Sequence, residues 1–166
     1  MGSRYLIGIG IVFLMGSCSE EKRWDCVKSV GKEITEERVV AGFDELYVSD
    51  KIDVQIVQDT LYKVEVTAGK NIIGKVKTEL EGTVLRITDE NKCNFMRTYK
   101  RKITVHLHLP TLKKVIHEGV GKVTSTNVIL KDTLELWTLS AGDIDLQVAS
   151  TKILTHLIGT GDIYLS

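Results

Sequence analysis

From Phe43 onward, apolar and polar residues alternate along the chain with a period of two, in one short segment after another. In each segment, β-branched and aliphatic residues fall on one face, which is the pattern of a half-buried strand. Turn-forming residues separate the segments, and none after residue 43 has the 3.6-residue period and the caps of a helix. The pattern predicts an all-β protein, and the clearest strands are expected at residues 51–58, 62–68, 83–89, 102–110 and 143–149.

A motif then repeats three times towards the end of the chain. It reads "GVGKVTS" from residue 119, "SAGDIDL" from residue 140 and "GTGDIYL" from residue 159, at spacings of 21 and 19 residues. A period near 20 in strand-rich sequence is typical of a solenoid, in which each coil buries its apolar face against the next. We therefore expect Ile144 and Leu146 to face inward and to lie over Ile163 and Leu165.

Small residues recur at the same positions of this motif. A coil that bends sharply from one sheet to the next needs a positive φ, which glycine adopts without a Cβ clash. We expect this role at five turn glycines, namely Gly119, Gly121, Gly142, Gly159 and Gly161.

Three stretches carry a resemblance to a known family. They are "TEERVVAGFDELYVSDKIDVQIVQ", "LRIT" and "ITVHLHLPTLKKVIHEGVGKV", followed by the repeated G-x-G coils. Over about residues 36–166 the chain resembles the "putative auto-transporter adhesin, head GIN domain" family. The resemblance implies a right-handed single-stranded β-helix, a β-solenoid of the pectin-lyase-like type with coils of about 20 residues and small-residue turns. It implies no agreed catalytic set, and cell adhesion is the function that the family is assigned by analogy.

Family members would be expected to continue with further coils where this sequence stops, at "GTGDIYLS". An uncovered last coil exposes unpaired backbone groups and an apolar edge. We expect self-association or a swapped strand to cover it, so a homo-oligomer is an expected partner state.

The beginning of the chain has the features of an export signal. A single positive charge at Arg4 precedes the apolar run Tyr5–Met15, which has 11 residues and is too short to span a bilayer as a helix. The sequence "LMGSC" resembles the lipobox of bacterial lipoproteins, so residues 1–17 are expected to be removed and Cys18 to be acylated. The alternative is an ordinary secreted protein with an incidental cysteine.

Residues 18–38 are rich in charges of both signs and are interpreted as a lipidated N-terminus and solvated tether, with the β-solenoid head at residues 39–166. Ser19, Glu20 and Glu21 resemble the acidic signal that sends some lipoproteins to the outer face of the outer membrane; the alternative is a hydrophilic start to a linker. We expect an exported outer-membrane lipoprotein at the cell surface, with the periplasmic face still open.

Composition limits the classes of function. Without residues 1–17, the chain carries 21 basic and 22 acidic residues, so it lacks the positive charge on which nucleic-acid binding depends. Its length suits one domain. Cys26 and Cys93 have no disulfide-domain spacing and are not expected to pair, although the sequence leaves this open.

Three patterns that could carry chemistry are weighed against structural roles. "EGVGKVTS" lacks the spacing of a phosphate loop and precedes a strand, so it is rejected. His106 and His108 share one strand face and could chelate zinc, but only His117 and Glu118 follow nearby, so an exposed polar face is preferred. Asp143, Asp145 and Asp162 could bind calcium or cleave a polysaccharide, although the nonapeptide calcium repeat is absent and a solvated face is preferred. Trp137 is expected in the core.

The densest basic stretch is the preferred ligand surface. Residues 92–102, "KCNFMRTYKRK", place aromatic rings among cations, an arrangement that suits anionic glycans or lipid headgroups. The alternative is a long exposed connection between strands. The candidate residues are Lys92, Phe95, Arg97, Tyr99, Lys100, Arg101 and Lys102.

These observations favour a lipid-anchored envelope protein that acts as an adhesin or binding module, not an enzyme, with no cofactor and no metal. Its expected partners are the membrane, through the N-terminal lipid, and a glycan or a host or cell-surface protein. One alternative is a periplasm-facing structural or signalling scaffold. A polysaccharide-active enzyme is less favoured, because only architecture suggests it.

Overall fold

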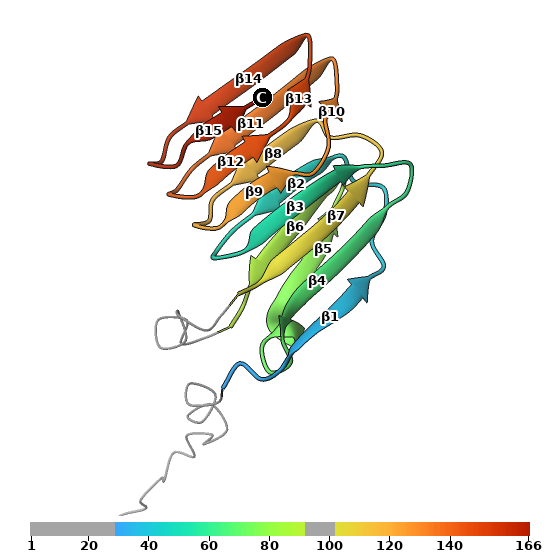
Figure 1. Ribbon diagram of the computed structural model, residues 1–166, viewed down its shortest axis with the longest axis vertical. Helices are drawn as coiled ribbons and strands as arrows, with labels where there is room; N and C mark the ends of the chain where they lie inside the picture. The colour runs from blue at the N-terminus through green and yellow to red at the C-terminus, as the bar shows by residue number, and fades with distance from the viewer. Residues whose placement is uncertain (1–28, 92–101) are drawn as a thin grey trace, which may run out of the picture.

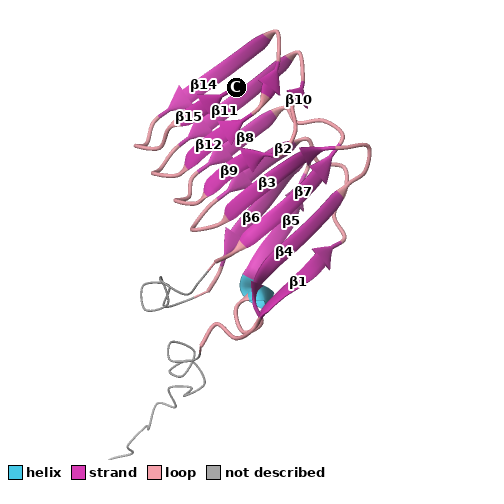
Figure 2. Cartoon of the chain, in the orientation of Figure 1, coloured by secondary structure: helices cyan, strands magenta, loops and turns pink. Residues whose placement is uncertain are grey.

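The computed structural model describes residues 29–91 and 102–166, which fold almost entirely into β-strands (Figure 1; Figure 2). The one helix among the described residues is the short 3-10 helix η2, Ile73–Lys75. The all-β class is therefore correct. No helix in the described parts of the chain is long or apolar enough to cross a membrane.

Two large sheets and one small sheet make up the fold. The seven-stranded sheet has the order β1 (Glu33–Arg38), β4 (Lys63–Gly69), β7 (Thr104–Leu109), β3 (Asp53–Gln58), β9 (Lys122–Ser125), β12 (Asp143–Leu146) and β15 (Ile163–Leu165). The six-stranded sheet has the order β14 (Lys152–Leu157), β11 (Thr133–Thr138), β8 (Lys114–His117), β2 (Glu45–Val48), β6 (Val84–Asp89) and β5 (Val76–Glu81). The two-stranded sheet pairs β10 (Ile129–Leu130) with β13 (Val148–Ala149).

Strand pairs repeat as units along the stack. We call a unit a strand of the six-stranded sheet together with the strand of the seven-stranded sheet that follows it in the chain; the units are β2–β3, β6–β7, β8–β9, β11–β12 and β14–β15. Their strands pair in parallel with the neighbouring unit. Ile144 pairs with Val123 on one side and with Ile163 on the other, so the register expected from the 21- and 19-residue spacings is confirmed.

The expected right-handed single-stranded β-helix of pectin-lyase-like type over residues 39–166 is wrong. The sheets are mixed, because β4 is antiparallel to both β1 and β7, and β5 is antiparallel to β6. The order of the units also differs from their order in the sequence, since β2–β3 lies between β6–β7 and β8–β9. Successive coils of about 20 residues therefore do not account for the first half of the domain.

A tight hairpin explains part of this difference. Glu81 pairs with Val84, so only Gly82 and Thr83 connect β5 to β6, and Gly82 has a φ of 63°. A two-residue loop with a positive φ favours an antiparallel pair because its twist matches that of the strands. The hairpin returns the chain along its own sheet, where a solenoid would have crossed to the opposite sheet.

The strand β1 lies within residues 18–38, the segment that we interpreted as a tether. It pairs with β4 over its whole length, and the hydroxyls of Thr35 and Thr67 are 2.8 Å apart. Only Ile34 of this strand packs as an apolar residue against the core, so alternation alone did not reveal it. Part of the presumed tether is therefore built into the sheet.

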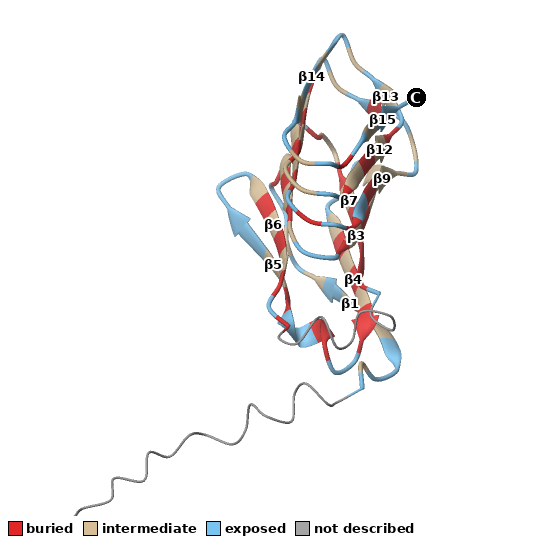
Figure 3. Cartoon of the chain, turned by 90° about the vertical axis from the view of Figure 1, so that its left-hand side faces the viewer, coloured by how far each residue is buried: buried red, intermediate tan, exposed pale blue. Residues whose placement is uncertain are grey.

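The core lies between the two large sheets, whose buried residues line the facing sides in Figure 3. Alternation places Leu134 and Leu136 of β11 opposite Ile144 and Leu146 of β12, and all four are fully buried. At the end of the stack formed by β1, β4 and β5, the buried residues Ile72 and Ile73 complete the core.

Candidate functional site

Four short turns lead from the six-stranded to the seven-stranded sheet, at residues 49–52, 118–121, 139–142 and 158–162. They lie above one another because their flanking strands pair in register, and they follow the left-hand edge of Figure 1. We call this edge the glycine corner. The segment of residues 90–103 makes the same step between β6 and β7.

The reason for glycine at this corner differs from the one expected. Positive φ angles occur among the described glycines at Gly31, Gly42 and Gly82 but not at the five turn glycines. Instead, a Cβ on Gly121 would lie 1.9 Å from the carbonyl oxygen of Ile52, and a Cβ on Gly161 would lie 2.1 Å from that of Gly142. The stacked turns approach so closely that no side chain fits between them.

His117 explains a further part of this packing. It points into the core at the end of β8 with no exposed surface, and neither ring nitrogen has a hydrogen-bond partner. A Cβ on Gly142 would lie 2.0 Å from Cε1 of the ring. Burial lowers the pKa of His117 below its ordinary value of 6.5, and the nearby Asp143 and Asp53 carboxylates oppose this shift only in part.

The aspartates next to the corner have structural partners. As expected, Asp143 and Asp145 lie on the outer face, whereas Ile144 and Leu146 are buried. Asp143 Oδ1 accepts a hydrogen bond of 3.0 Å from the backbone N–H of Asp162, and Lys122 Nζ lies 2.8 Å from Asp145 Oδ2. These carboxylates therefore cap backbone groups or pair with a cation, which favours the structural interpretation over a calcium or hydrolytic site.

The histidines expected to be weighed as metal ligands are separated. His106 and His108 lie on the outer face of β7, and His108 Nδ1 is 3.1 Å from Asp59 Oδ2, whereas His117 is inside the core. Within residues 29–91 and 102–166, no group of three or more His, Cys, Asp or Glu residues is placed to hold a metal ion.

An aromatic row crosses the outer face of the six-stranded sheet. Contrary to expectation, Trp137 is outside the core; its ring stacks on His156 with 3.7 Å between centroids, and its Nε1 donates to Glu135. Lys114 Nζ lies 5.3 Å from the centre of the same ring. This hydrogen bond lowers the pKa of Glu135, and the charge of Lys114 adds to the shift. Because neighbouring side chains occupy the surroundings of the indole, it does not offer an open ring for stacking a sugar.

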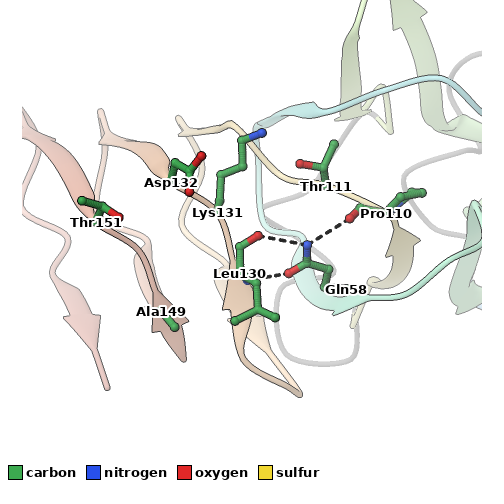
Figure 4. Close-up of a pocket in the computed structure, with 8 residues that line it drawn as sticks. All are labelled: Gln58, Pro110, Thr111, Leu130, Lys131, Asp132, Ala149 and Thr151. Atoms are coloured by element: carbon green, nitrogen blue, oxygen red, sulfur yellow. Dashed lines mark hydrogen bonds between the residues drawn. The ribbon is translucent and has the colours of Figure 1, made fainter.

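A polar groove of about 430 Å³ lies on the side of the stack away from the glycine corner (Figure 4). Gln58 closes one end of it: its Nε2 donates to the carbonyl oxygens of Pro110 (2.9 Å) and Leu130 (3.2 Å), and its Oε1 accepts from the Leu130 N–H. The side-chain amide thus takes the place of a further strand beside β10. The groove is lined by Gln58, Pro110, Thr111, Leu130, Lys131, Asp132, Ala149 and Thr151.

The preferred ligand surface lies almost wholly outside the described residues. Of its seven candidates only Lys102 is described, and it is exposed. Both ends of the segment are fixed, because Asn91 is buried and donates from Nδ2 to the Ile72 carbonyl, and Ile103 is buried in the core. Val48 pairs with Ile87 and Asp53 with Thr104, so the segment starts and ends beside the turn of residues 49–52. Cys18, Cys26 and Cys93 also lie outside the described residues.

Comparisons with known proteins agree with this architecture. A "putative lipid binding protein" and a "putative adhesin", both from Parabacteroides distasonis, have TM-scores of 0.63 and 0.57 at 21% and 20% identity. Each match covers 82% of this chain, which spans 61% and 66% of the two proteins. A "putative adhesin" from Bacteroides fragilis has a TM-score of 0.52 at 15% identity, covering 81% of this chain and 97% of that protein. At these identities the likeness concerns the fold alone.

A comparison with curated proteins found no match. Residues 42–166, three quarters of the sequence, match the family described as "Putative auto-transporter adhesin, head GIN domain". The chain therefore belongs to this adhesin family.

Proposed function

We propose that the protein is an exported, lipid-anchored protein of the cell envelope whose β domain acts as an adhesin or binding module at the cell surface. The observation that carries this proposal is the family match over residues 42–166 of a chain that begins with an export signal and a lipobox-like cysteine. Acyl chains on Cys18 would hold the domain at the outer membrane, because each buried CH₂ group contributes about 0.8 kcal/mol.

The basic segment of residues 92–102 is the proposed ligand surface. Its buried ends fix it beside the glycine corner, and Lys102 is exposed there. Cations beside aromatic rings suit a glycan with acidic groups or an acidic surface on a partner protein.

Two other functions have less support. A periplasm-facing scaffold would need the same anchor but no ligand surface. A polysaccharide-active enzyme would need free carboxylates, and those of Asp143 and Asp145 are engaged with a backbone N–H and with Lys122. Binding of an acyl chain, suggested by the description of one solved neighbour, is not favoured by the groove, because that groove is open and its lining is mainly polar.

A binding array tests the ligand surface. The purified chain is applied to a glycan array and to a panel of cell-surface proteins, beside a variant in which Lys100, Arg101 and Lys102 are replaced by glutamine. We expect binding to fall at least about tenfold in this variant, because charge-assisted contacts are lost. The matched control replaces Lys32, Lys70 and Lys77, which lie near the other end of the stack; equal loss in both variants would point to net charge and contradict the proposed surface.

Protease treatment of intact cells tests the location. Digestion of the β domain on intact cells supports the surface position, and a Cys18→Ala variant should leave the membrane fraction. Digestion only after the outer membrane is permeabilised would favour the periplasmic scaffold.

A further inference from the structure

The end of the stack formed by β14 and β15 leaves the core uncovered. Leu157 pairs in register with Thr138, and Leu165 pairs with Leu146, so all four side chains face the interior. Thr138 and Leu146 have no exposed surface, whereas Leu157 and Leu165 are 55% and 41% exposed. These strands form the upper end of the molecule in Figure 1.

The opposite end differs in both packing and charge. There Ile72 and Ile73 are buried, and the outermost strands, β1 and β5, carry charged residues. Charged side chains on edge strands are a common protection against pairing with another chain. These charges are Glu33, Glu36, Glu37 and Arg38 on β1, and Lys77, Glu79 and Glu81 on β5.

The edge at β14 and β15 lacks this protection. Besides His156, Lys152 is the one ionisable residue of β14, and β15 (Ile-Tyr-Leu) contains no charged side chain. Leu154, Ile158 and Tyr164 add exposed apolar surface beside the open core. Each of the two strands pairs with one neighbour among the described residues, so one backbone edge of each is available.

We propose that a second copy of this chain covers this edge in a two-fold dimer. β14 pairs antiparallel with β14 of the second copy, and β15 with its counterpart, so the two cores become continuous. A two-fold axis at Thr155 places Ile153 opposite Leu157 on the core side and Leu154 opposite His156 on the outer side. No like charges then face each other, and threonine lies opposite threonine, which is a favourable pair.

The second copy is the occupant that the two ends favour. A head-to-tail contact would place the open core of one molecule against an end that Ile72 and Ile73 already close, and would leave one open end free at each step. A two-fold contact covers both open ends at once and closes at the dimer.

Size-exclusion chromatography with light scattering on the purified full-length chain, over a concentration series, tests the dimer. Leu157→Lys should weaken dimerisation at least about tenfold, because it brings a charge onto the apolar core side of the contact. Leu80→Lys is the matched control, since Leu80 is an exposed leucine on β5, and it should leave the dimer intact. Circular dichroism identifies a variant that has not folded; in that case Leu154→Lys, on the outer side of β14, replaces it.

Cross-linking tests the register. In a chain whose native cysteines are replaced by serine, Thr155→Cys should form a covalent dimer with a short thiol-to-thiol reagent, and Leu80→Cys should not. A parent chain that stays monomeric at high concentration, or one that forms open polymers, would overturn the proposal. So would protection of the β14 amides from hydrogen exchange in a monomer, which would mean that another segment of the same chain covers the edge.

Discussion

Asp143 and Asp162 occupy the same position in neighbouring units, and the side chain of the first binds the backbone of the second: Asp143 Oδ1 accepts from the Asp162 N–H at 3.0 Å. Asp53 Oδ1 accepts from the Lys122 N–H at 3.1 Å in the same way, two units away. The carboxylate thus satisfies an N–H at the point where a turn enters the seven-stranded sheet. Aspartate in this motif therefore links units and does not mark a catalytic set.

Asp143→Ala should lower the free energy of unfolding by about 1–2 kcal/mol, because the Asp162 N–H loses a charged acceptor. Asp143→Asn should cost less, since its side-chain oxygen still accepts. Urea denaturation measures both. Added calcium should change neither the parent nor the Asn variant; stabilisation of the parent alone by calcium would contradict the structural role.

Gly142→Ala should destabilise the fold by about 3 kcal/mol or more, because the new Cβ would meet His117 Cε1 and the backbone oxygen of Gly121. His117→Ala should restore only part of the loss, since the clash with the backbone remains. Gly74→Ala is the control: a Cβ there meets nothing within 4 Å, so its unfolding midpoint should change little.

Acid should destabilise the protein through His117. Its pKa is lowered in the folded state, so the unfolded chain binds a proton at the ordinary value of 6.5 while the folded chain does not. This contribution is fully present above pH 6.5, falls as the pH drops from 6.5 to the lower folded pKa, and is constant below it. His117→Leu should lose less stability than the parent between pH 7.5 and pH 5, as measured by urea denaturation at each pH. An unchanged pH dependence would show that other groups cause the loss.

Gln58→Ala should lower the free energy of unfolding by about 1–3 kcal/mol, because Leu130 and Pro110 lose the hydrogen bonds that the amide supplies beside β10. Gln55→Ala, on the outer face of the same strand, is the control and should change stability by less than about 0.5 kcal/mol. Similar losses in the two variants would mean that the amide is not a substitute for a strand.

Local patterns predicted a large part of this fold. The repeated motif gave the register of Val123, Ile144 and Ile163 because three aligned copies leave little choice of pairing. The placement of β2–β3 within the stack could not be predicted, since nothing in one sequence specifies which distant strands pair. The hairpin at Gly82 had a detectable signal, two alternating segments separated by two residues, and that signal argued against a continuous β-helix.

The site was predicted less well. The turn glycines were recognised, but the need for glycine at Gly121 comes from the Ile52 carbonyl, which is far away in the sequence. For the same reason, alternation did not reveal that His117 is buried without partners or that Trp137 is outside. Neighbouring strands determine these environments, and one sequence does not identify them.

The position of β2–β3 in the middle of the stack sets an order for folding. These strands are among the first to be synthesised, yet their partners in β7 and β9 come about 50 and 70 residues later. Such long loops must close before the central pairing is gained, so this step limits the folding rate. The units that follow then add in sequence order to a surface that already exists. Gain or loss of a unit during evolution is therefore tolerated after β9, and deletion of residues 45–58 abolishes the domain.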